Sequence, residues 1–113
     1  MVLSQMITVE STLSASNTDF LSGTQLDQPG VAGVYTIWLA STVGDTTVSI
    51  TLGGRTLVST ATVVLRANSE IREDEDNFFQ MASRTGGRPV INVTESTSMI
   101  CRVRVKFIPA YPT

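Results

Sequence analysis

The chain has 113 residues, a length that fits a single domain. Its net charge of −2 argues against a nucleic-acid-binding protein, which typically has a basic surface. It contains no histidine and one cysteine, which argues against Ser-His-Asp and Cys-His catalysis and excludes an internal disulfide. The 16 threonines and 12 serines make up about a quarter of the chain, and the hydrophobic fraction of 42% is that of a folded protein. These proportions predict a weakly charged, folded protein that is not an enzyme.

The first third of the sequence predicts two strands in otherwise irregular chain. Met1–Glu10 is predicted as the first strand and Asp19–Leu26 as a weaker second, and the segment 11–33 is the most linker-like. Met1–Glu10 has neither the basic start nor the long apolar run of a signal peptide, and nothing approaches the ~18 apolar residues of a membrane span. We therefore expect synthesis in a reducing cytoplasm and no membrane partner.

The most regular strand is predicted at Val34–Ser41. Tyr35, Ile37 and Leu39 alternate there with Val34, Thr36, Trp38 and Ala40, so that both faces carry apolar groups. A strand of this kind lies in the centre of a sheet or beneath a partner subunit.

The middle of the chain predicts a hairpin. Thr46–Leu52 alternates cleanly, and Gly53-Gly54 separates it from the β-rich run Arg55–Thr60. Two glycines between such runs favour a two-residue turn, because type I′ and II′ turns need positive φ angles. A further strand is predicted over Thr62–Ala67.

Residues 68–88 interrupt the strand pattern, and two strands follow them. We expect this segment to be a long functional or interfacial loop with at most one helical turn. Val90–Thr94 is predicted as a strand, and Met99–Ile108 as the last, ended by Pro109.

The fold class predicted is all-β. Seven or eight short strands without a convincing helix indicate a single antiparallel β-sandwich, or jelly-roll-like, domain over residues 1–113. Within it, residues 1–33 are expected either to join the sandwich or to form a less regular N-terminal arm.

An acidic run stands out in the interrupting segment. Five of the ten acidic residues lie within it, namely Glu70, Glu73, Asp74, Glu75 and Asp76. Calcium binding and glycoside hydrolysis are possible chemistries for clustered carboxylates, but the EF-hand spacing is not met and sugar-binding aromatics are scarce. A solvated loop is the simplest interpretation. The neighbouring Phe78-Phe79 pair favours a docking loop, because apolar anchors ringed by charge are typical of interfaces.

A basic stripe lies on one face of the last strand. It consists of Arg102, Arg104 and Lys106, which alternate with apolar residues. One interpretation is a solvated outer face whose like charges discourage edge pairing. The other is a contact with an acidic partner, and nucleic acid is the least favoured because no aromatic side chain interleaves the stripe.

Together these segments give the predicted partner-contact residues. They are Glu73, Asp74, Glu75, Asp76, Phe78, Phe79, Arg102, Arg104 and Lys106.

Two further residues invite a functional interpretation, and for both we favour a structural one. Cys101 alternates with Met99 and Val103 and is expected to be a small buried hydrophobe, since no histidine is present to activate it. Trp38 cannot share a sugar-binding platform with Tyr35 because alternation places the two on opposite faces, so we expect it in the core. No catalytic, cofactor-binding or metal-binding residues are predicted.

The stretch TTVSITLGGRTLVSTATVVLRA, the acidic run and the ending RPVINVTESTSMICRVRVKFIP resemble small capsid decoration, or cement, proteins of tailed bacteriophages. The similarity covers roughly residues 46–109 and lies in size, strand style and strand order rather than in a diagnostic motif. It implies a β-sandwich, synthesised in the host cytoplasm, that trimerises on the capsid surface of the virion and bridges units of the major capsid protein.

A second interpretation remains open from the residues. A β-sandwich of this size also suits a carbohydrate- or receptor-binding module on a virion fibre, a tail or a cell surface. Such a module would present exposed aromatic side chains on a concave face.

Overall fold

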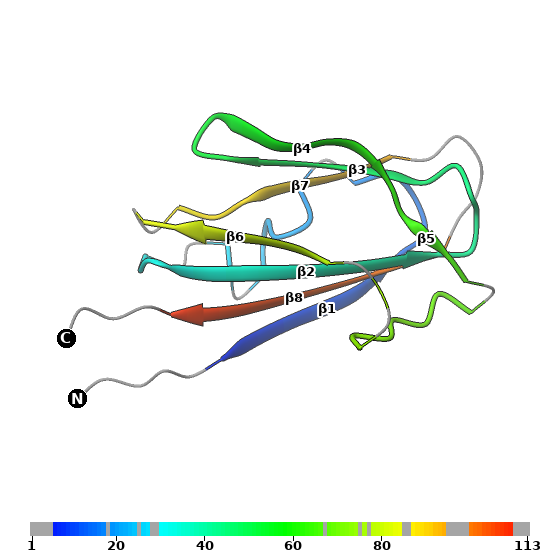
Figure 1. The fold of residues 1–113 in the computed structure, drawn as a ribbon, viewed down its shortest axis with the longest axis horizontal. Coiled ribbons are helices and arrows are strands. Elements are labelled where there is room, and N and C mark those ends of the chain that lie inside the picture. The colour runs from blue at the N-terminus through cyan, green and yellow to red at the C-terminus, as the bar shows by residue number, and fades with distance from the viewer. Residues whose placement is uncertain are drawn as a thin grey trace.

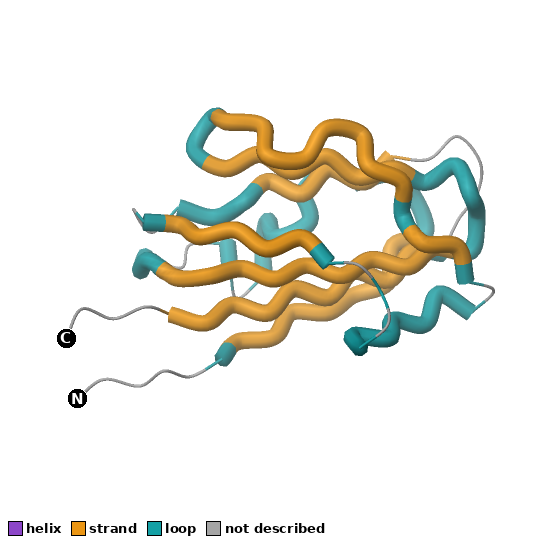
Figure 2. Tube along the Cα trace, viewed as in Figure 1, coloured by secondary structure: helices purple, strands orange, loops and turns teal. Residues whose placement is uncertain are grey.

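The structure is a computed structural model that describes residues 6–17, 19–24, 26–27, 30–66, 68–74, 76, 78–84, 87–94 and 100–109. These residues form eight strands, and Figure 2 shows no helix among them. The strands are β1 (Ile7–Leu13), β2 (Gly33–Ser41), β3 (Thr47–Leu52), β4 (Arg55–Thr62), β5 (Val64–Leu65), β6 (Phe79–Ser83), β7 (Val90–Thr94) and β8 (Cys101–Pro109). None of the described residues belongs to a helix that is long and apolar enough to cross a membrane.

The strands form two sheets that pack face to face (Figure 1). The larger sheet has the order β1-β8-β2, and both β5 and β6 pair with the free side of β2. The smaller sheet has the order β4-β3-β7. Every pair is antiparallel except β2 with β5, which is parallel. The predicted all-β class is therefore confirmed.

The glycine pair forms the predicted turn between β3 and β4. Leu52 pairs with Arg55 across it, and the φ angles of Gly53 and Gly54 are 62° and 77°. Side chains with a Cβ rarely adopt such angles, so the glycines allow the hairpin to close.

The main core lies between the two sheets and follows the alternation of the strands. On β8 it receives Cys101, Val103, Val105 and Phe107, which are at most 1% exposed. The facing strands contribute, among others, Tyr35, Ile37, Leu39, Val48, Ile50, Ile91 and Val93. The expectation that Cys101 is a buried hydrophobe is confirmed. Because inward residues alternate with polar ones, the two outer faces are left for contact with solvent or partners.

The strand predicted at Asp19–Leu26 is wrong. The described part of this segment forms consecutive turns, in which Ser22 donates to the carbonyl of Asp19 and Thr24 to that of Leu21. Phe20, Leu21 and Leu26 are still buried in the main core. These side chains are buried by turns rather than by the alternation of a strand. A search for apolar residues at every second position therefore does not predict their structure. The first strand is Ile7–Leu13 rather than Met1–Glu10, and residues 1–5 lie outside the described chain.

Two other predictions are corrected in the middle of the chain. The strand predicted over Thr62–Ala67 is reduced to the two residues of β5, because the chain crosses here from one sheet to the other. Val63 makes the crossing, buried at 4% exposure, with its N–H bonded to the carbonyl of Thr46. The loop predicted over residues 68–88 contains a strand, β6, that pairs with the first half of β2.

Candidate functional site

The basic stripe lies on a central strand. β8 pairs with β1 on one side and β2 on the other, and Met99 of the predicted strand lies outside the described residues. The interpretation of Arg102, Arg104 and Lys106 as charges that guard a sheet edge is therefore wrong. Their side chains point to the outer face of the larger sheet, because the residues between them fill the core.

The acidic loop comprises residues 66–78 between β5 and β6, and its described residues fold over this stripe. Glu73 accepts hydrogen bonds from Nη1 of Arg104 at 2.7 Å and from Nζ of Lys106 at 2.6 Å. The hydrogen bond from Lys106 is the main cause that lowers the pKa of Glu73; burial opposes it, and Arg104 reinforces it. Two sets of residues that the sequence predicted separately as partner contacts thus meet each other within one chain.

A second carboxylate neutralises the rest of the stripe. Glu10 of β1 accepts a hydrogen bond of 2.8 Å from Nε of Arg104 and lies 3.8 Å from Nε of Arg102. The stripe is therefore compensated within the chain by Glu10 and Glu73, and its attraction for an external anion is reduced accordingly.

Asp76 anchors the end of the acidic loop. Its side chain is 2% exposed, forms an ion pair with Arg66 and accepts a 2.9 Å hydrogen bond from the backbone N–H of Arg72. Burial raises the pKa of Asp76, but the backbone N–H of Arg72 and the Arg66 guanidinium together outweigh it, so the pKa is lowered overall. A buried charge with these partners fixes the loop rather than meeting solvent.

The remaining acids of the run are placed differently. Glu70 is paired with Arg72 at 2.8 Å on the surface, and Asp74 is exposed. Glu75 lies outside the described residues. No group of three or more metal-ligating side chains that could hold an ion is found in the described part of the chain.

The two phenylalanines of the loop diverge. Phe79, the first residue of β6, packs against the main core, while Phe78 is 50% exposed and lies on Trp38 with ring centroids 5.8 Å apart. Trp38 is buried, as predicted, but on the outer face of the sheet, in a small cluster with Ala40 and Ile71. Nζ of Lys106 lies 5.3 Å from its ring. The loop thus covers the only tryptophan of the chain.

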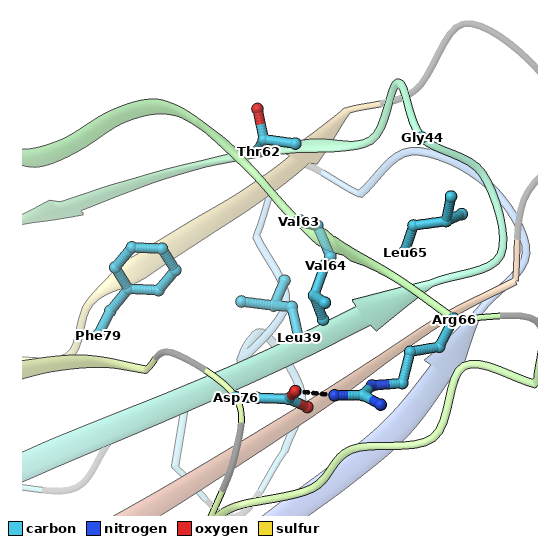
Figure 3. A pocket seen from close by; sticks show the side chains of 9 residues that line it. All are labelled: Leu39, Gly44, Thr62, Val63, Val64, Leu65, Arg66, Asp76 and Phe79. Atoms are coloured by element: carbon cyan, nitrogen blue, oxygen red, sulfur yellow. Dashed lines mark hydrogen bonds and ion pairs between the residues drawn. The ribbon is translucent and has the colours of Figure 1, made fainter.

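A pocket of about 630 Å³ opens beside this loop (Figure 3). Leu39, Val63 and Phe79 form part of its apolar lining, and the ion pair between Arg66 and Asp76 lies at one side. Sequence reasoning missed this pocket because it forms between β5 and β6, two strands whose shared partner β2 is fixed only by the fold.

A second ionic cluster also escaped the sequence analysis. Arg88 donates to Asp19 at 2.9 Å and to the backbone carbonyl of Asp27 at 2.8 Å. The hydrogen bond with Asp19 is the main cause that raises the pKa of Arg88. This arginine ties the turns of residues 19–27 to the chain before β7, across more than sixty residues of sequence, a separation that no local pattern reveals.

The chain matches no family model, no curated protein and no solved structure.

Proposed function

We propose that the chain is a capsid decoration protein, a structural component of a virion that binds the outer capsid surface and stabilises it by bridging capsomers. It acts as a homotrimer, with the major capsid protein as its partner and without cofactor or catalysis. The resemblance of residues 46–109 to phage cement proteins supports the virion setting, and one outer face of the sandwich supports the mode of contact.

Among the described residues of β3, β4 and β7, none that faces outward from the smaller sheet is charged. We call this outer face the hydroxyl face; its residues are Thr47, Ser49, Thr51, Thr56, Thr62, Val90, Asn92 and Thr94. The strand alternation places them opposite the buried Val48, Ile50, Ile91 and Val93. Bringing such a face against another protein removes no ion from water, and short side chains lose little conformational freedom on contact.

The outer face of the larger sheet is less suited to contact with a partner. It is charged, and the acidic loop already covers part of it through Glu73 and Ile71. A partner that docked there would have to displace these contacts. The hydroxyl face needs no such rearrangement, which makes it the surface we assign to the capsid.

The proposal is tested with heads assembled from the major capsid protein encoded in the same genome, by cosedimentation with the purified chain. We expect saturable binding that Thr51→Lys weakens by about tenfold or more, since it buries a charge in the contact. Ser11→Lys adds the same charge on β1 and should bind as the wild type does. Absence of binding to the heads, or normal binding by Thr51→Lys, would show that the proposal is wrong.

The alternative of a carbohydrate-binding module requires an exposed aromatic platform. Trp38 does not offer one, because it is 7% exposed and packs against Ile71 beside Phe78. Binding of the purified chain to a glycan array would favour the module over the decoration protein.

A further inference from the structure

The two long sides of the sandwich, where the edges of the sheets face each other, are closed differently. At the β7 edge the chain covers itself: Asn17 exchanges hydrogen bonds of 2.9 and 2.7 Å with Val93, and the N–H of Phe20 donates to Ile91 at 3.1 Å. Phe20, Leu21 and Leu26 from this segment fill the space beneath. The outer edge of β7 is therefore paired at Ile91 and Val93.

The other side, where β4 faces β6, has no such cover among the described residues. β4 pairs only with β3 and β6 only with β2, so each presents one unpaired edge. Two pockets lie here, one at each end of β6: the 630 Å³ pocket at Phe79 and one of about 580 Å³ at Ala82 and Ser83 (Figure 3 shows the first). We call this the open side.

The register shows which backbone groups of β6 face the open side. In an antiparallel ladder successive residues direct their N–H and C=O groups alternately to the two neighbours. The N–H of Thr42 donates to the carbonyl of Ile100, next to the Ser41–Cys101 pair. The backbone N–H and C=O groups of even-numbered residues of β2 are therefore directed to β8, and those of odd-numbered residues to β6. Gln80 and Ala82, which pair with even-numbered residues, therefore direct their N–H and C=O groups outward.

The two ends of the open side differ in chemistry. The end at Phe79 is largely apolar: Leu39, Val63 and Leu65, the last 60% exposed, line its pocket, and the ion pair between Arg66 and Asp76 lies at one side. The end at Ala82 is lined by the exposed guanidinium side chains of Arg55 and Arg84. Neither arginine forms an ion pair with any residue that the structure describes. The free edge thus lies between an apolar pocket and a positively charged one.

We infer that the open side binds an extended segment of a partner protein, which adds to β6 as an antiparallel strand. Its alternate side chains are apolar and enter the space between the sheets, and an acidic residue at its N-terminal end lies against Arg55 and Arg84. The antiparallel direction is chosen because such pairs are the more stable and the more common. Backbone hydrogen bonds supply affinity in this mode, and the pockets supply specificity.

The side chains that line the two pockets determine the chemistry of the segment that fits the open side. The acidic end follows from the two unpaired arginines, and the apolar positions follow from Leu39, Val63 and Phe79. The inference does not rest on the proposed function, since it is argued from the β6 edge and the pocket linings, and any partner with such a segment would fit.

The test uses the capped peptide ETVTIT as the probe and the whole chain as the receptor, titrated by NMR with isotope-labelled protein. We expect saturable shifts confined to β4, β6 and the residues around both pockets. The peptide KTVTIT should bind about tenfold more weakly, because it places a cation against Arg55 and Arg84. Shifts on β1 or β7 instead, or no binding at millimolar peptide, would overturn the inference.

Two variants distinguish strand pairing at the β6 edge from non-specific binding of the peptide. Ala82→Pro removes an N–H that β2 does not use, so the fold should persist while binding falls at least about fivefold. Arg84→Gln should weaken ETVTIT and leave its neutral analogue QTVTIT unchanged, and Arg102→Gln, with the same charge change on β8, should affect neither. Unaltered binding by folded Ala82→Pro would refute the inference. A dimer of the chain that Ala82→Pro dissociates and ETVTIT fails to displace would assign the open side to a second copy and also refute it.

Discussion

The ion pairs of Glu73 carry the sharpest stability prediction. Replacement of Glu73 by Gln keeps the shape of the side chain and removes its charge, so that the two carboxylate oxygens that Arg104 and Lys106 now reach at 2.7 and 2.6 Å become one neutral acceptor and one NH2 donor. Charged hydrogen bonds contribute about 1.5–3 kcal/mol when buried and less than about 1 kcal/mol when exposed. The three side chains are 21–30% exposed, so we expect a loss of about 1–2 kcal/mol in the free energy of unfolding.

Urea denaturation at pH 7 measures this loss, and the emission of Trp38 reports where it occurs. A loss of 1–2 kcal/mol corresponds to a fall in Tm of roughly 4–10 °C for a chain of this size. Because Trp38 is the only tryptophan and Ile71 and Phe78 of the acidic loop pack on it, loosening of the loop should shift its emission to the red. The denaturant slope should stay unchanged, since the core is intact.

The pH dependence gives an independent check of the same interaction. The pKa of Glu73 is lowered in the folded chain from its ordinary 4.5, so its ion pairs contribute stability above that value and lose it as the pH falls through the folded-state pKa. The difference between the wild type and Glu73→Gln should therefore shrink steadily below about pH 4.5.

A matched substitution on the same loop controls for net charge. Asp74→Asn removes an equal charge from an exposed residue, and we expect a change within about 0.5 kcal/mol. If Glu73→Gln costs no more than Asp74→Asn, or if its cost persists at low pH, the acidic loop is not held by these ion pairs.

Three further predictions concern the core and the segment that closes it. Gly33→Ala should destabilise the chain by about 1–3 kcal/mol in urea denaturation, because the added Cβ would lie 2.4 Å from the Phe107 ring; an unchanged midpoint would contradict this contact. Leu21→Ala should cost about 2–5 kcal/mol if the turns of residues 19–24 belong to the core, whereas a loss under about 0.5 kcal/mol would place them outside it. Burial raises the pKa of Cys101 to about 11, so the native thiol should resist alkylation at pH 8 and react only on unfolding; rapid labelling of folded protein would show that the strand alternation of β8 is misassigned.

Local chemistry made part of the fold predictable. The sequence predicts β2, β3, β7 and β8 near their observed positions, because the alternation of apolar and polar side chains depends only on neighbouring residues. The glycine pair before β4 predicts the hairpin for the same reason. The strand β6 was missed because its five residues follow the acidic run and only Phe79 and Met81 are large apolar residues. The turns that bury Phe20 and Leu21 place consecutive apolar residues in the core, which alternation does not describe.

The candidate site was predictable only in its parts. The acidic run and the basic stripe are visible in the sequence, but they read as two partner-binding segments because Glu73 and Arg104 are 31 residues apart. Their mutual pairing depends on where β8 lies in the sheet. The open side and the unpaired Arg55 and Arg84 depend likewise on which strands become edges, and strand periodicity carries no information about that order.

Electron cryomicroscopy of heads assembled from the major capsid protein and incubated with this chain tests the central proposal most directly. We expect added density on the outer surface, as trimers of the two-sheet sandwich that bridge capsomers with the hydroxyl face of β3, β4 and β7 toward the shell. Heads that remain bare at saturating chain would contradict the proposed function. Density attached through the face that carries Glu73 and Arg104 would contradict the assigned contact.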